Sequence, residues 1–108
     1  MNLENHTENA KMLLQTIQAT GYGSGKCTLI LRASTNKSLK KERDFELETY
    51  GSGKHKKPEY WKELHNKLQP EHLKVMNPGS VRIKYEITAA GCDAMSGKKL
   101  VLLGPILI

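Results

Sequence analysis

The first clear pattern in the chain is a set of apolar residues at helical spacing near its start. Between Thr7 and Thr20 they recur at intervals of three and four, at Ala10, Leu13, Leu14 and Ile17. This spacing places them on one face of a helix. Glu8 falls in the first turn, where an acidic side chain is favourable, and Gly21 follows the last turn, where glycine commonly ends a helix. The pattern predicts an amphipathic helix from Thr7 to Thr20.

A second stretch with the same periodicity runs from Pro58 to Gln69. Proline fits the first position of a helix because its fixed φ and missing N–H do no harm there. Trp61, Leu64 and Leu68 form one apolar stripe, which we expect to lie in the core. The polar side chains Lys62, Asn66 and Gln69 fall on another face.

Further along, the apolar residues alternate with polar ones, as in a β-strand with one buried face. Val81 to Thr88 alternates strictly, and Leu73 to Met76 precedes it across the turn Asn77-Pro78-Gly79-Ser80. This predicts a β-hairpin. Pro-Gly suits a type II turn, whose twist fits a tight hairpin poorly, so the arms should splay near the tip.

The other segments are less regular. Cys27 to Leu31 is a short apolar run whose periodicity is equally compatible with a buried helix or a strand. Ser34 to Arg43 is polar and basic and suits a loop, whereas Ala89 to Met95 suits a short helix. An apolar tail, Lys99 to Leu103, follows. The order predicts an α+β fold, a winged helix with a C-terminal hairpin wing, in one domain spanning 1–108 with tails at 1–6 and 97–108.

Charge singles out the middle of the chain. The 108 residues hold 17 Lys and Arg against 11 Asp and Glu, a net charge of +6, and eleven of the cations lie between residues 26 and 67 with only six acids. Concentrated positive charge favours a polyanion such as nucleic acid or an anionic membrane surface. A merely solvated basic face is the alternative.

Several other classes of protein find no support in the sequence. No apolar run is long enough for a membrane span, and no signal-peptide pattern is present, so we expect a soluble intracellular domain. Two cysteines, Cys27 and Cys92, exclude a disulfide scaffold and a four-thiolate zinc site. The glycines before Lys26 lack phosphate-loop spacing. His55, His65 and His72 lack metal-ligand spacing and are expected at the surface. We predict no catalytic residue, no metal and no cofactor.

Three blocks, in order, resemble the RQC domain of RecQ-family DNA helicases. They are Leu29-Ile30-Leu31-Arg32-Ala33-Ser34, Thr49-Tyr50-Gly51-Ser52-Gly53-Lys54 and Glu59-Tyr60-Trp61-Lys62. The family carries an apolar run ending in Leu-Arg-Gly-Ser, a Gly-x-Gly-Lys block and a Trp-Lys pair. Ile87-Thr88-Ala89-Ala90-Gly91 makes the Werner type the nearest match. The resemblance covers Ala10 to Gly91 and implies that Cys27 to Arg32 is a helix.

By this resemblance the domain is not an enzyme but an accessory module. Its partners are duplex and forked DNA and the ATPase domains of the same parent polypeptide; we expect a monomer and, from the Werner-type pattern, a nuclear location. The implied contacts to DNA phosphates, which fix position without reading sequence, are Arg32, Ser34, Lys37, Lys40, Lys41, Lys54 and Lys62. The implied strand-separating wedge in the wing comprises Met76, Asn77, Pro78, Gly79, Val81 and Arg82.

Two departures from the family leave alternatives open. The family's next basic contact falls on Ser38, so nearby lysines must substitute for it, and Val81 stands where Werner-type wings carry an aromatic residue. The wing either forms a smaller wedge or only grips DNA. Arg32 could instead pair with Glu42 or Asp44, Ser34 could cap a helix, and Lys62 could be solvated.

Two rival functions also remain. A winged-helix transcription regulator would read adenine with Asn66 or Gln69. A protein-interaction module would dock through the apolar tail from Leu100 to Ile108.

Overall fold

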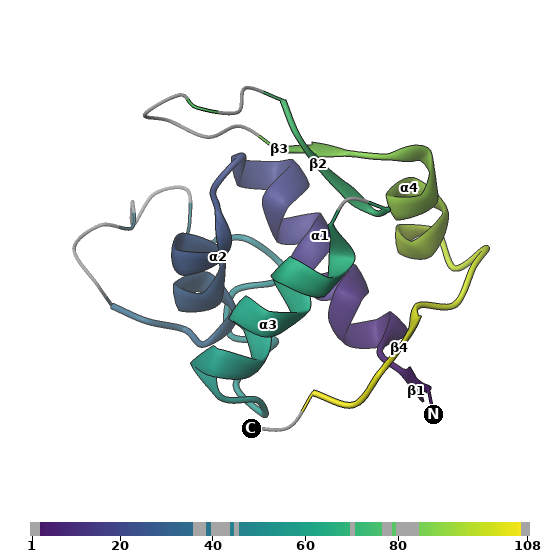
Figure 1. The fold of residues 1–108 in the computed structure, drawn as a ribbon. Coiled ribbons are helices and arrows are strands. Elements are labelled where there is room, and N and C mark those ends of the chain that lie inside the picture. Colours follow the sequence, from purple (N-terminus) through teal and green to yellow (C-terminus); the bar gives the residue numbers. More distant parts are fainter. Residues whose placement is uncertain are drawn as a thin grey trace.

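In the computed structural model, residues 3–35, 39, 44, 46–69, 71–76, 79 and 85–106 are described. These residues form four helices and two short antiparallel sheets, the winged-helix arrangement predicted from the sequence (Figure 1). The first helix, α1 (Thr7–Thr20), has the predicted bounds. It ends at Gly21, whose φ of 74° is left-handed and whose amide donates to the carbonyl of Ile17. Glycine adopts this conformation without steric cost, so it terminates the helix.

The short apolar run after Gly21 is helical. Helix α2 (Ser24–Leu31) settles the choice between helix and strand, and it begins three residues before Cys27. Helix α3 (Pro58–Leu68) follows the long connection and has proline in its first turn, as predicted. Together α1, α2 and α3 form the three-helix core.

The predicted stripes meet in this core. Ala10, Leu13 and Leu14 of α1 are fully buried, as are Trp61 and Leu64 of α3. The expectation that Trp61 packs inside rather than stacking on a base is thus confirmed. A tryptophan at this place buries a large apolar area in the core of a small domain.

The wing consists of β2 (Leu73–Val75) and β3 (Tyr85–Ile87), paired antiparallel with Leu73 opposite Ile87. Both arms of the predicted hairpin are therefore present, although residues 81–84 and the predicted splaying near the tip lie outside the described residues. Gly79 has a φ of 84°, as a type II turn requires at its third position. Helix α4 (Ala89–Met95), capped by the Thr88 hydroxyl, follows as predicted.

The first and last strands of the domain lie side by side. Strand β1 (Glu4–Asn5) pairs antiparallel with β4 (Leu102–Leu103), and the His6 amide donates to the carbonyl of Val101 at 2.8 Å (Figure 1). Val101 is buried, whereas Leu102 is exposed. The segments predicted as tails thus contribute a strand pair and a core residue. Of the apolar residues near the end of the chain, Val101 is buried and Leu103 and Ile106 pack against the core.

Candidate nucleic-acid interface

A groove of about 560 Å³ lies between α2 and the start of α3. Three of the predicted phosphate contacts, Arg32, Ser34 and Lys62, line it together, although Lys62 is 28 residues beyond Ser34 in the sequence. Lys62 is exposed on α3, and Arg32 and Ser34 are half-exposed at the end of α2. The fold therefore brings two cations and a hydroxyl to one concave surface. Their contact with DNA remains a prediction.

The end of α2 sets the directions of Arg32 and Ser34. The Ala33 amide donates to the Ile30 carbonyl at 3.1 Å and the Ser34 amide to the Leu29 carbonyl at 2.8 Å, the two hydrogen bonds of a Schellman motif. This motif needs a left-handed residue, and Ala33 takes that position with a φ of 58°. Alanine stands here where the family pattern has glycine, so the turn is kept at a steric cost.

Arg32 is held against the loop that precedes α3. Its Nη1 donates to the backbone carbonyls of Lys54, at 3.3 Å, and of Lys56. Of the acids proposed as alternative partners, Glu42 lies outside the described residues, and Asp44 accepts a hydrogen bond from the Tyr22 hydroxyl. A guanidinium has five donors. Arg32 is thus oriented by the loop and keeps donors for a further acceptor.

The Gly51-Ser52-Gly53-Lys54 block is tied to α2 by hydrogen bonds. The Gly51 amide donates to the carbonyl of Ile30 and the Gly53 amide to that of Leu31, both at 2.8 Å. Trp61 Nε1 donates to the Gly53 carbonyl at 3.0 Å. A Cβ at Gly53 would lie 2.5 Å from the Trp61 ring, so this position has no room for a side chain. The block also places the backbone carbonyl of Lys54 against Arg32, and the Lys54 side chain is exposed.

One more cation belongs to this face, and its place in the sequence did not single it out. Lys26 lines the groove, with its ammonium group 4.6 Å from the centre of the Tyr22 ring. Lys56 and Lys57, exposed at the start of α3, line a different pocket beside Tyr60, and the ammonium group of Lys56 lies 4.9 Å from the centre of the Tyr60 ring. Once α2 is known to be a helix, Lys26 falls three residues before Leu29, on the groove side. In the sequence, the glycines before Lys26 suggest a phosphate loop and not a position on a helix face.

The base of the wing lies next to the groove. A Cβ at Gly23 would come within 3.5 Å of the Tyr85 ring on β3. Gly25, which lines the groove, is only two residues further on, at most about 7 Å of chain. Met76 at the end of β2 is 52% exposed, and Gly79 is exposed too. Of the other residues predicted to act here, Asn77, Pro78, Val81 and Arg82 of the wing lie outside the described residues, as do Lys37, Lys40 and Lys41.

The comparison with protein families agrees with this geometry. The family model for the RQC domain matches residues 2–105, nearly the whole chain. The chain is an RQC domain. Such domains are the DNA-binding, non-catalytic accessory modules of RecQ-type helicases. No curated protein matches the chain.

The histidines of this RQC domain are not all at the surface, which corrects the sequence-based expectation. His65 is 2% exposed and His72 is 8% exposed, and only His55 is open to solvent. His65 packs edge-on against Tyr85 with 4.9 Å between ring centres, and its Nδ1 is 3.1 Å from Nε2 of Gln69. Burial lowers the pKa of His65. The contact with Tyr85 places His65 at the junction between α3 and the wing, away from water.

The rival role of α3 as a base-reading helix loses one of its two candidates. The Gln69 side chain, expected to read adenine in a transcription regulator, is engaged by His65. Asn66 remains exposed. A bidentate contact to adenine needs a free amide whose two ends both reach the base edge. Gln69 would have to give up its contact with His65 to provide one.

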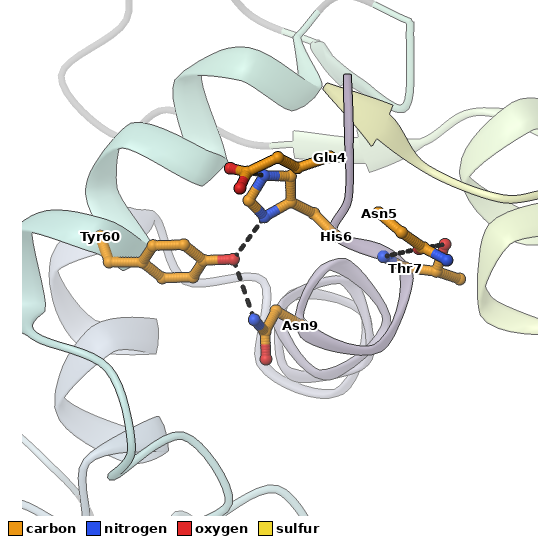
Figure 2. A network of polar contacts seen from close by, with 6 residues as sticks. All are labelled: Glu4, Asn5, His6, Thr7, Asn9 and Tyr60. Carbon is orange, nitrogen blue, oxygen red and sulfur yellow. Dashed lines mark hydrogen bonds and ion pairs between the residues drawn. The ribbon is translucent and has the colours of Figure 1, made fainter. Parts of the chain in front are cut away.

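A polar network joins the start of the RQC domain to α3 (Figure 2). Tyr60 is 4% exposed, and its hydroxyl lies 2.8 Å from His6 Nδ1 and accepts from Asn9 Nδ2 at 2.9 Å. His6 Nε2 faces the Glu4 carboxylate at 3.6 Å. The Tyr60 hydroxyl can donate to His6 Nδ1 while it accepts from Asn9. Burial raises the pKa of Tyr60, so the phenol stays protonated.

The thiols and possible metal ligands add no chemistry to this site. Cys27 and Cys92 are both free, Cys27 buried and Cys92 exposed. Burial raises the pKa of the Cys27 thiol to about 12, which makes it unreactive packing. In the part of the chain that is described, no three His, Cys, Asp or Glu side chains gather as a metal site would require. None of the described helices is long and apolar enough to cross a membrane.

Proposed function

We propose that this RQC domain binds the phosphates of duplex and forked DNA, selecting for DNA structure and not for sequence. The observation that carries the proposal is the shared groove of Lys26, Arg32, Ser34 and Lys62, which adjoins the base of the wing. Cations and a hydroxyl are the groups that hold phosphate oxygens. Contacts to phosphates fix the position of the protein without reading the sequence.

The geometry favours Arg32 and Lys62 as the principal contacts. Arg32 is already oriented by two carbonyls, so it loses little side-chain entropy on binding. Lys62 projects from the rigid helix α3, and Lys54 extends the row. If these three residues and Lys26 each neutralise one phosphate, the logarithm of the binding constant should fall with the logarithm of salt concentration with a slope of about −3.5.

The wing would act at the end of the duplex. In this proposal the hairpin forms a small wedge whose apolar side chains, Met76 among them, press on the last base pair, as in the Werner type. Opening one step costs a few kcal/mol, which inserted apolar groups partly offset. The anchor for such a wedge is the packing of Tyr85 on His65 and beside Gly23, which fixes the base of β3 to the helical core.

The phosphate contacts are tested by DNA titration with matched lysine variants. Fluorescence anisotropy measures the Kd for a fork, a duplex and a single strand at one salt concentration. Lys62→Ala should weaken fork and duplex binding about five- to tenfold. Lys67→Ala is the control, because Lys67 is an exposed lysine on the same helix that does not line the groove. Equal losses in both variants, or single strands bound as tightly as forks, would contradict the proposal.

The wedge needs its own measurement. A 2-aminopurine in the last base pair of a fork reports unpairing through its fluorescence. Binding of the unchanged domain should raise that fluorescence, and replacing residues 77–80 by Gly-Gly should abolish the rise while leaving the Kd within about twofold. If the rise persists in the shortened wing, the hairpin only grips DNA.

A further inference from the structure

We propose that the groove between α2 and α3 holds one unpaired nucleotide, with its base on an apolar floor and its phosphate on the cationic rim. This inference rests on the proposed function and adds a second element to it. Phosphate binding alone explains the cations but leaves the floor of the groove without a role. The floor gives the domain a means of recognising a junction between double and single strands.

The floor is built from apolar groups that the core does not use. All residues of α2 are described, and its other large apolar side chains, Cys27, Ile30 and Leu31, are buried, whereas Leu29 is half-exposed in the groove. Pro58, also half-exposed, faces the same space from the start of α3. Exposed apolar side chains gathered in a concave site are the usual feature of a ligand pocket.

The size and the shape of the groove suit more than a phosphate group. Its volume of about 560 Å³ falls within the range typical of small-molecule sites, about 300–1,000 Å³. Gly25 contributes no side chain, and a Cβ there would meet no atom within 4 Å. Gly25 and Leu29 are four residues apart on one face of α2, and both line the groove opposite Pro58.

Charge complementarity selects a nucleotide over a neutral ring. Lys26, Arg32 and Lys62 surround the floor, and each carries a positive charge. A phosphate attached to the base satisfies these cations while the ring covers Leu29 and Pro58. Inside a duplex the faces of each base are covered by neighbouring base pairs, whereas an unpaired base beyond the last pair can present a face to the floor. Aliphatic groups read no hydrogen-bond pattern, and the site should accept any base.

The test compares three duplexes that differ at one end: blunt, with a one-nucleotide adenine overhang, and with a one-residue abasic overhang. Adenine and abasic overhangs carry the same phosphates and differ only in the base. The unchanged domain should bind the adenine overhang about fivefold more tightly than the abasic one. Equal Kd values for these two ends would overturn the inference.

Two variants examine the floor directly. Leu29→Ser removes the apolar surface without changing charge, and Gly25→Leu fills the open space. Each variant should remove the difference in Kd between the adenine and abasic overhangs while leaving the Kd for the blunt duplex unchanged. Leu102→Ser is the control, because Leu102 is an exposed leucine away from the groove. Should Leu29→Ser reduce the thermal stability, Gly25→Leu still decides the question.

Failure of the inference and failure of the proposed function give different results. If Lys62→Ala weakens all three duplexes and the adenine gain is absent, phosphate binding stands and the nucleotide site is refuted. If Lys62→Ala changes none of the three Kd values, the proposed function itself fails. If the gain is present and Leu29→Ser and Gly25→Leu both keep it, the base lies elsewhere and the inference is overturned.

Discussion

Replacing Gly53 by alanine should destabilise the domain more than its small change in volume suggests. The new Cβ would lie 2.5 Å from Cζ2 and 2.9 Å from Cε2 of Trp61, and 2.9 Å from Cβ of Leu31. Trp61 and Leu31 are both fully buried, so neither can move aside without shifting α3 or α2. Overpacking of this kind costs about 1–3 kcal/mol.

A second loss of stability in Gly53→Ala would come from the hydrogen bond between Trp61 Nε1 and the Gly53 carbonyl. If the clash displaces the loop and lengthens this bond, about 1 kcal/mol more is lost. The sum of about 2–4 kcal/mol corresponds to a fall in Tm of roughly 10–20 °C for a domain of this size. The same displacement would move the carbonyl of Lys54, one of the two that orient Arg32.

Thermal unfolding followed by circular dichroism measures this effect, with Gly25→Ala as the matched control. Gly25 lies within α2 and has open space around its Cβ position, so alanine there should leave the Tm unchanged or raise it slightly. A Gly53→Ala variant that melts within 2 °C or so of the unchanged domain would refute the packing argument, since such a small shift is well under 1 kcal/mol.

Four further predictions concern single residues elsewhere in the domain. Ala33→Gly should raise the free energy of unfolding by about 1 kcal/mol in urea titrations, because it relieves the left-handed φ of 58°; a decrease would contradict the strain. Burial lowers the pKa of His65, so as the pH falls through about 6.5 the unfolded chain takes up a proton that the folded domain does not. The free energy of unfolding should therefore be full above that pH and fall below it, more steeply than in His65→Phe. Parallel plots of unfolding free energy against pH for the two proteins would count against this. A maleimide at pH 8 should modify Cys92 but not Cys27, whose pKa is about 12, and mass spectrometry should find two labels only after unfolding. Tyr60→Phe should cost about 1–2 kcal/mol of stability, since His6 Nδ1 and Asn9 lose their partner; an unchanged urea midpoint would show the network to be dispensable.

The helices with long, regular apolar stripes could be predicted from the sequence almost to the residue. Helix α1 is fourteen residues long, its apolar stripe recurs from Ala10 to Ile17 and Gly21 follows its last turn, so both the periodicity and the stop signal are present. Pro58 marks the start of α3 in the same way. The short α2 offered an apolar run of only five residues, too short for a period to be distinguished, and before the structure its helical form was implied by the family resemblance alone.

What the sequence could not supply are features that depend on which segments meet in space. The pattern around His65 does not reveal that Tyr85, twenty residues later, covers it. Nor does the composition near the chain ends reveal that residues 4–5 pair with residues 102–103. Such contacts have a large sequence separation and leave no local signal. For the same reason Arg32 and Lys62 could be selected as candidates but not placed on one groove.

The antiparallel pairing of β1 with β4 determines how the domain would respond to mechanical load. Glu4 lies opposite Leu103, so once Ile106 has been pulled away from the core, tension on the two strands separates this pair first and then the inner ones, as in unzipping. Next in line are the hydrogen bonds that link His6 and Thr7 to Val101, both 2.8 Å long. A force applied through both strands would therefore open the β1–β4 pair before it reached α2 or the wing.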